Sequence, residues 1–244
     1  MPEKSFTNIL TKPDKAMNKE EKIQNILDIL NQHFPDPPVP LHHRNTFTFL
    51  VAVMLSASAT DKKVNEVTPI LFDLADSAEK MYLLSASQIK TIIHDVGLSN
   101  GKSKNIHAMS KLLLERHAGE VPNTFSALEA LPGVGHKTAS VVMSQSFGEP
   151  AFAVDTHIHR LAYRWGLSNG SSVKQTETDL KKCFEEKDWN RLHLQIIYFG
   201  RKFCPALRHD AENCPICSWA LTKKRLAEEQ KRVAPWQPKP KKRK

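Results

Sequence analysis

The sequence predicts an all-α protein, and three observations support this fold class. Apolar residues recur at the three- and four-residue spacing of amphipathic helices along most of the chain. Several glycines directly follow such runs, as helix terminators do. Paired alternating segments joined by a tight turn, the signal of a β-hairpin, do not occur. The 244 residues are 40% hydrophobic and 25% charged, which is the balance of a globular protein.

Four helices are expected in the N-terminal half, after a polar leader. Residues 1–19 have mixed charge and lack the apolar core of a secretory signal, so we expect an intracellular protein. A first helix begins near Glu20 and ends before the prolines of 35–40, which exclude helical backbone. The apolar segment 47–59 has the length of a buried helix rather than a strand. Two further helical patterns cover 61–74 and 104–117.

Helical patterns continue through the C-terminal half, over 126–130, 137–147, 180–203 and 217–232. In the first of these, Ser126 and Glu129 have the spacing of a capping box. No run of about 18 apolar residues occurs anywhere, so no membrane span is expected.

The net charge of +9 is concentrated at the C-terminus. Residues 231–244 carry seven basic side chains and no acid, which leaves a charge of only +2 for the rest of the chain. This tail is expected to be unfolded. It either adds non-specific affinity for DNA through counterion release or serves as a nuclear localisation signal. The four cysteines are too few for a disulfide scaffold and favour a reducing compartment.

The segment LPGVGHKTA (131–139) joins two expected helices through a glycine-rich turn. Gly133 and Gly135 allow a tight turn and let the backbone approach a bulky ligand. The free N–H groups at the start of the next helix suit a phosphate group. A simple helix–turn–helix corner with no ligand explains the same residues.

Two residues beside this turn have the chemistry of a catalytic pair. Lys137 lies in the first turn of a helix, where the dipole and partial burial disfavour the ammonium form and make the amine a better nucleophile. Asp155 precedes the amphipathic run 158–165 and has the position of an N-cap. The alternatives are a surface lysine that contacts phosphate and a carboxylate that only caps a helix. His157 and His159 are interpreted as structural or as DNA-facing.

Three cysteines close to the C-terminus form a candidate metal site. Cys204, Cys214 and Cys217 follow the pattern C-x9-C-x2-C, which suggests a metal ion or an iron–sulfur cluster. Cys183 lies apart and is expected to be a core thiol.

Together these motifs resemble endonuclease III, a DNA glycosylase family of the helix–hairpin–helix superfamily. The resemblance covers residues 20–220. It is carried by LSASATD (55–61), VGLSNGKSKNI (96–106), LPGVGHKTASVV (131–142) and AVDTHIHRLAYR (153–164), and by the eighteen-residue separation of Lys137 and Asp155.

The resemblance implies an enzyme that excises oxidised pyrimidines from duplex DNA and then cleaves the strand as an AP lyase. Lys137 would attack C1′ of the damaged nucleotide and form a Schiff base, and Asp155 would stabilise charge on the sugar and assist proton transfer. The damaged base would be flipped out of the duplex. DNA contacts are expected from Leu131, Gly133, Val134, Gly135, Thr138, Leu98, Ser58 and His157, of which Leu98 would be the apolar wedge.

The resemblance also implies two all-α domains with a cleft between them. A six-helix barrel domain would span 40–149. A discontinuous domain would combine 20–39 with 150–220, followed by a helix end at 221–230 and the tail 231–244. The protein would act as a monomer on duplex DNA, in the cytoplasm or nucleoid of a bacterium or the nucleus of a eukaryote.

The chain departs from the family pattern at two places. The family ligates a 4Fe–4S cluster through C-x6-C-x2-C-x5-C, whereas here the first gap is nine and Lys223 occupies the fourth position. The interpretations are a 4Fe–4S cluster with an incomplete ligand set, a Cys₃His zinc site with His209, or no metal. Many family members have glutamine at the position of Ser58.

Two other functions are compatible with the motifs. A monofunctional adenine glycosylase of the same superfamily generally lacks the lysine nucleophile, so Lys137 argues against it. A non-catalytic module would use the turn at 131–135 only to hold DNA phosphate.

Overall fold

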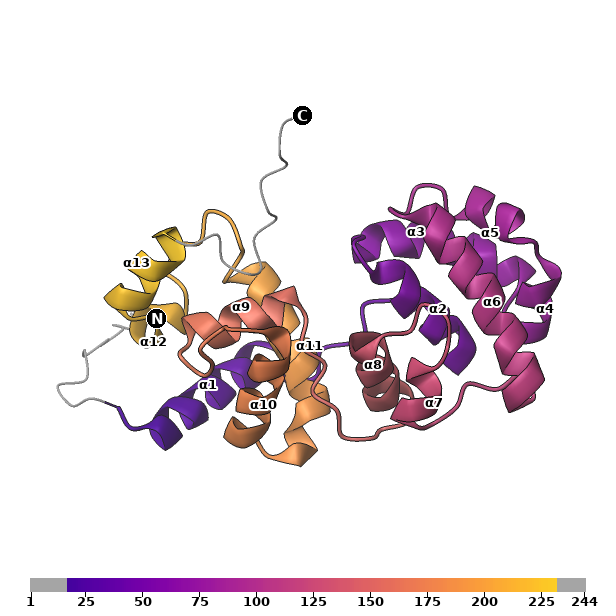
Figure 1. The fold of residues 1–244 in the computed structure, drawn as a ribbon. Helices are drawn as coiled ribbons and strands as arrows, with labels where there is room; N and C mark the ends of the chain where they lie inside the picture. The colour runs from indigo at the N-terminus through magenta and orange to yellow at the C-terminus, as the bar shows by residue number, and fades with distance from the viewer. Residues whose placement is uncertain (1–16, 232–244) are drawn as a thin grey trace, which may run out of the picture.

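A computed structural model describes residues 17–231, and these residues form an all-α structure (Figure 1). The predicted leader and basic tail lie almost entirely outside the described residues. The helices are α1 (Lys19–His33), α2 (Thr46–Ser56), α3 (Asp61–Leu74), α4 (Ala78–Leu83), α5 (Ala86–Ile92), α6 (Ser99–His117), α7 (Phe125–Glu129), α8 (His136–Ser146), α9 (Thr156–Arg164), α10 (Val173–Cys183), a 3₁₀ turn η1 (Glu186–Asp188), α11 (Trp189–Lys202), α12 (Cys217–Ala220) and α13 (Lys223–Lys231). No strand occurs within 17–231, so the predicted fold class is confirmed.

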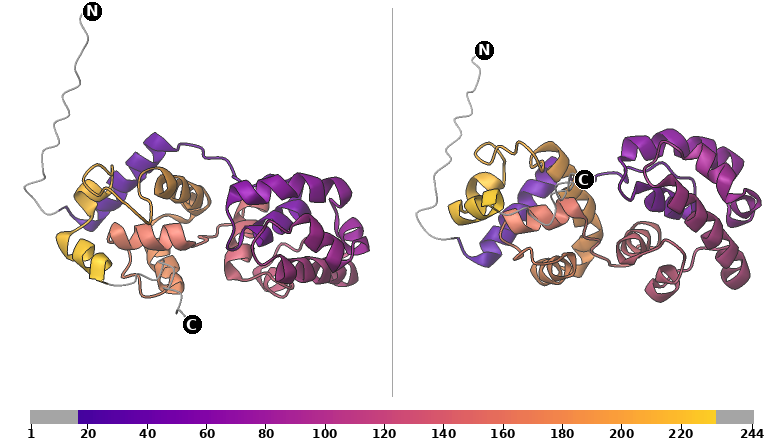
Figure 2. Two further views of the ribbon diagram at one scale, coloured as in Figure 1. Left: turned by 90° about the horizontal axis from the view of Figure 1, so that it is seen from above. Right: turned by 45° about the horizontal axis from the view of Figure 1, so that its top comes forward.

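The helices gather in two lobes, each with its own apolar core (Figures 1 and 2). The first lobe contains α2 to α8. The second lobe combines α1 with α9 to α13, so residues from both ends of the chain share one core. Ile26 and Leu30 of α1 are fully buried there, and α1 packs on α11. The chain crosses between the lobes after α1 and again between α8 and α9, as both figures show.

Helix α2 is the centre of the first lobe. Every residue from Phe47 to Leu55 is buried, because α3, α6 and α8 pack around it. This explains why the segment is apolar on all faces. Burial of each large apolar side chain contributes about 1.5–3 kcal/mol, so this helix anchors the core of the lobe.

Several predicted boundaries were wrong. The run 180–203 is not one helix, since α10 ends at Cys183, Phe184 is extended and α11 begins only at Trp189. The run 217–232 is likewise divided between α12 and α13. Helix α7 is capped by Thr124, whose hydroxyl accepts from the Ala127 amide at 3.4 Å, so the capping box of Ser126 and Glu129 does not form.

None of the described helices is both long and apolar enough to cross a lipid bilayer.

Candidate active site

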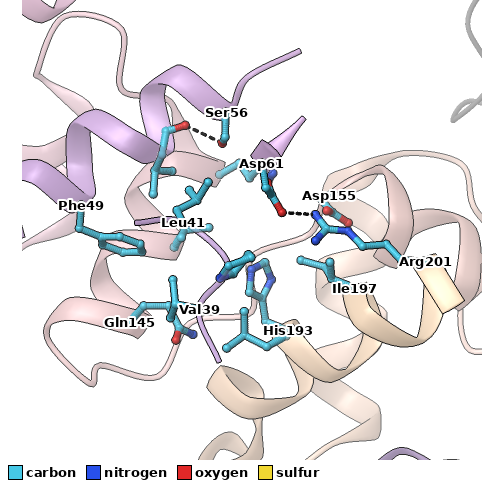
Figure 3. A pocket seen from close by; sticks show the side chains of 15 residues that line it. Val39, Leu41, Phe49, Ser56, Asp61, Gln145, Asp155, His193, Ile197 and Arg201 are labelled. Carbon is cyan, nitrogen blue, oxygen red and sulfur yellow. Dashed lines mark hydrogen bonds and ion pairs between the residues drawn. The ribbon is translucent and has the colours of Figure 1, made fainter. Parts of the chain in front are cut away.

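A cleft with a cavity volume of about 80 Å³ lies where the two lobes meet (Figure 3). The first lobe contributes residues of α2, the start of α3 and α8. The second lobe contributes Asp155 and residues of α11. The lining residues are Val39, Pro40, Leu41, Phe49, Val53, Ser56, Asp61, Lys137, Val141, Gln145, Asp155, His193, Leu194, Ile197 and Arg201. The wall is thus mostly apolar, and charged groups from both lobes converge in it.

Lys137 reaches the cleft from the first turn of α8. The lysine is exposed, so the partial burial expected from the sequence is not observed. No side chain caps α8, because its N-cap is Gly135. Among residues 17–231 the first amides of α8 therefore have no capping side chain, and they are available to a group that lies beside Lys137.

Asp155 is the N-cap of α9, and its carboxylate accepts from the Ile158 amide at 2.9 Å. Burial alone would raise the pKa of Asp155, but the nearby Lys137 ammonium and the amide of Ile158 hold that pKa below its usual value. The carboxylate therefore stays ionised beside Lys137. Asp155 is thus both the N-cap of α9 and a carboxylate that lines the cleft.

His193 of α11 is a cleft residue that sequence reasoning missed. It is buried, and its Nδ1 donates to the Ala153 carbonyl at 2.7 Å. Burial lowers the pKa of His193, so the imidazole is neutral and Nε2 is its free acceptor. No local sequence pattern indicates that His193 lines the cleft, because the residue lies in an ordinary amphipathic helix.

An ion pair between the lobes was also missed. Arg201 of α11 contacts Asp61, the first residue of α3, with Nη2 and Oδ2 separated by 2.7 Å (Figure 3). The pair lies at one edge of the cleft. It joins segments so far apart in the sequence that spacing could not have indicated it.

The turn between α7 and α8 takes the form of a helical hairpin. Leu131 and Val134 are buried, so these two side chains belong to the core. Gly133 has φ +80°, and a Cβ there would lie 2.8 Å from atoms of the Asn105 side chain. Gly135 has no such neighbour within 4 Å, and its backbone does not require glycine. The first glycine thus shapes the turn, whereas the second leaves open space before α8.

Leu98 and Ser58 lie in two adjacent loops of the first lobe. Both have left-handed backbone, with φ 62° and 59°, and both are exposed. The Ser58 carbonyl lies 3.4 Å from the point where a Cβ on Gly97 would stand, which brings the loops together. Lys102 of α6 fixes this arrangement, since its buried ammonium donates to the carbonyls of Leu55 and Ala57 at 2.8 and 2.6 Å.

His157 and His159 of α9 have different environments. His157 lines a shallow pocket beside Thr60 and Arg201, and burial lowers its pKa. His159 is buried, with Nδ1 at 2.8 Å from the Thr176 hydroxyl. The structural interpretation therefore fits His159, and His157 lies at the surface next to the cleft.

The predicted metal ligands come together in the second lobe, away from the cleft. Potential ligand atoms of Cys204, His209, Cys214 and Cys217 all lie within 4.8 Å of one another. The structure thus brings together a Cys/His cluster that could hold a metal, which is consistent with the expected metal site with an incomplete set of cysteines. Crowding of the sulfurs raises the pKa of Cys204 to about 11, through its hydrogen bond with Cys214. Lys223, at the family's fourth position, is exposed at the start of α13.

The chain is similar to known DNA repair proteins. Residues 51–186 match the family model of the HhH-GPD superfamily base excision DNA repair protein. Endonuclease III of Rickettsia felis is 43% identical over 80% of this chain and 91% of its own. Endonuclease III of Escherichia coli K12 is 41% identical over 82% of this chain and 94% of its own.

Solved structures give the same result. A non-covalent endonuclease III–DNA complex has a TM-score of 0.81 and 35% identity, and it covers 88% of this chain and 100% of the compared chain. A trapped endonuclease III–DNA covalent intermediate has the same values. A thermostable thymine-DNA glycosylase, with 22% identity and a TM-score of 0.70, shares the fold. The chain therefore belongs to the endonuclease III family of helix–hairpin–helix base excision DNA repair proteins.

Proposed function

We propose that this protein is a bifunctional DNA glycosylase and AP lyase that removes oxidised pyrimidines from duplex DNA. The observation that carries the proposal is the meeting of Lys137 and Asp155 in one cleft between two lobes. Lys137 offers an amine at a helix N-terminus, and Asp155 offers an ionised carboxylate within its electrostatic reach. Covalent catalysis by lysine needs this combination of a nucleophile and a proton acceptor.

The proposed reaction begins when Nζ of Lys137 attacks C1′ of the damaged nucleotide. The bond from C1′ to the base breaks, and the base leaves with a proton. Asp155 stabilises the positive charge that develops on the sugar and accepts a proton from the attacking amine. Ring opening gives a Schiff base between Lys137 and the sugar. Loss of the C2′ proton then expels the 3′ phosphate and cuts the strand.

The surroundings of the cleft suit a flipped nucleotide. The amides at the start of α8 and the open space at Gly135 offer a phosphate site, with Gly133, Val134, Leu131 and Thr138 holding the hairpin. Leu98, which is 71% exposed, supplies the apolar wedge beside Ser58. His157 extends the contact surface on the second lobe.

The two apolar cores support a division into two domains. We place a barrel domain at 40–149 and a discontinuous domain at 20–39 with 150–220. The named relatives are bacterial, which supports action on DNA in the cytoplasm or nucleoid, and we propose that the protein acts there as a monomer.

Borohydride trapping on an abasic-site duplex tests the proposal. Wild-type protein should give a covalent protein–DNA adduct, because borohydride reduces a Schiff base. Lys137→Ala should lose the adduct and slow cleavage by about 10³-fold or more, while DNA binding is retained. Lys90→Ala, an exposed lysine of α5, is the matched control and should trap normally.

Each alternative function gives a different result. Base excision without an adduct from folded wild-type protein would indicate a monofunctional glycosylase. Binding without either reaction would indicate a non-catalytic module.

A further inference from the structure

The Cys/His cluster has the dimensions of a site for a single ion. Sγ of Cys204 and Sγ of Cys217 lie 3.6 Å apart, and the four potential ligand atoms all lie within 4.8 Å of one another. Zinc–sulfur bonds of about 2.3 Å in a tetrahedron place sulfurs about 3.8 Å apart. A 4Fe–4S cluster bonds each ligand to a different iron, so a cube of iron and sulfide must lie between the ligands. The Cys/His side chains lie too close together to surround the iron–sulfide cube of a 4Fe–4S cluster.

His209 completes the set as a fourth ligand. Its Nε2 is buried and has no hydrogen-bond partner of ordinary geometry among residues 17–231, and the imidazole interacts with the Cys214 thiol beside it. Burial of an imidazole nitrogen with no partner costs free energy unless something binds it. Arg208, directly before it, has left-handed backbone with φ 56°. The first gap is three residues longer than in the family pattern, and His209 lies within it with a ring nitrogen close to the three sulfurs.

Lys223 does not replace the histidine. An ammonium group has no lone pair for a metal, and this side chain is exposed rather than turned into the cluster. The available ligands are thus three thiols and one imidazole, a combination that is common in structural zinc sites.

Neighbouring groups suit the charge of a zinc site. Three thiolates and Zn²⁺ carry a net charge of −1. Arg164, which is buried, donates from Nη1 to Cys204 Sγ at 3.2 Å and to the Pro205 carbonyl at 2.8 Å. The Cys217 amide lies 3.5 Å from Cys214 Sγ. Such outer contacts orient ligands and balance charge in metal sites.

From these observations we infer that Cys204, His209, Cys214 and Cys217 bind one zinc ion tetrahedrally, where the family pattern holds a 4Fe–4S cluster. The ion joins the end of α11 to α12 and fixes the C-terminal part of the second lobe. Its role is structural, since none of the four ligands lines the cleft. The inference is independent of the chemistry proposed for Lys137.

Metal analysis of the full-length protein tests the inference. The protein is expressed with iron and zinc both supplied, and metals, acid-labile sulfide and visible absorption are then measured. We expect about one zinc per chain, no sulfide and no brown colour, and tetrahedral cobalt(II) bands after substitution. Iron with sulfide would overturn the inference in favour of an incomplete cluster. A folded protein without metal, whose thiols react freely, would overturn it in favour of an empty site.

Variants of His209 give a second readout, by competition with a chromogenic zinc chelator. His209→Ala should weaken zinc binding by at least about 10–100-fold. His209→Cys should retain the ion, because it restores a tetrahedral ligand. His42→Ala, an exposed histidine of the first lobe, is the matched control and should bind zinc as the wild type does. Equal zinc affinity in His209→Ala and the control would exclude the histidine as a ligand.

Discussion

At the residue scale, Leu98 combines two costs that packing does not explain. Its side chain is 71% exposed, and its backbone lies in the left-handed region at φ 62°. That region costs a residue with a Cβ about 1–2 kcal/mol. Strain that persists at an exposed position points to a role outside folding. An apolar wedge into DNA is such a role.

Leu98→Gly should therefore maintain or raise the unfolding free energy but slow excision of a damaged base. Glycine removes the backbone strain, so the unfolding free energy should stay the same or rise by about 0.5–1 kcal/mol. Excision of a damaged base from duplex DNA should slow, because the wedge is lost. Urea denaturation and single-turnover excision measure the two effects.

Ala118→Gly is the control for this variant. Ala118 is also left-handed, with φ 52°, at the opposite end of α6. It should gain stability without loss of activity. Slower excision in Ala118→Gly as well would mean that α6, rather than the Leu98 side chain, governs the reaction.

Lys137 and Asp155, which we propose as the catalytic pair, could be selected from the sequence, but the groups around them could not. Lys137 and Asp155 stand in local motifs, a glycine-rich turn and a helix start. His193 enters the cleft only because α11 packs against α9, and no local signal encodes that contact. The pair of Arg201 and Asp61 depends on how the two lobes meet. The expectation that Lys137 is partly buried was also wrong, because its side chain is exposed to solvent in the structure.

At the element scale, the hairpin between α7 and α8 assigns different tasks to its two glycines. Gly133 needs its left-handed backbone and the space beside Asn105, whereas Gly135 needs neither. We propose that the open space at Gly135 lets a DNA phosphate approach the start of α8.

Alanine variants at the two positions should separate these tasks. Gly133→Ala should lower the unfolding free energy by about 1–3 kcal/mol, because it adds strain and a clash. Gly135→Ala should leave thermal stability unchanged but weaken binding to undamaged duplex DNA. Differential scanning fluorimetry and fluorescence anisotropy measure the two. Unchanged DNA affinity in Gly135→Ala would remove the phosphate contact from this turn.

At this scale the presence of a helix could be predicted from the sequence, but the breaks between successive helices could not. The segment 61–74 was predicted with the bounds of α3, because its apolar face is regular, and in the structure Thr60 caps this helix. The breaks near Phe184 and Leu221 were missed, because apolar spacing continues through both. Both breaks are marked by extended backbone, at Phe184 and at Leu221.

At the scale of the whole molecule, His136 links the two lobes. Its Nδ1 lies 2.7 Å from Glu129 of α7, and its Nε2 lies 3.1 Å from Glu177 of α10. The ring can donate both hydrogen bonds at once only when both of its nitrogens carry a proton and it is positively charged. Hydrogen bonding to Glu129 is the main reason that the pKa of His136 is raised.

This link predicts a pH-dependent stability. Because the folded pKa is above the unfolded one, the contribution is fully present below about pH 6.5 and is lost as pH rises through the folded pKa. The side chain is 59% exposed, so the effect is about 0.2–1 kcal/mol. The difference in unfolding free energy between wild type and His136→Ala should be larger at pH 6 than at pH 9. His42→Ala should show no such change, and a pH-independent difference for His136→Ala would show that the link is not ionic.

The order of the chain also governs how the protein emerges during translation. Helix α1 is made early, but the core that buries Ile26 and Leu30 is made of segments beyond α8. The first lobe is continuous and is synthesised in between. Domains generally fold as units as the ribosome releases them. The first lobe is thus complete while α1 still has an uncovered apolar face, so a nascent chain that stalls before α11 exposes that face to proteases and chaperones.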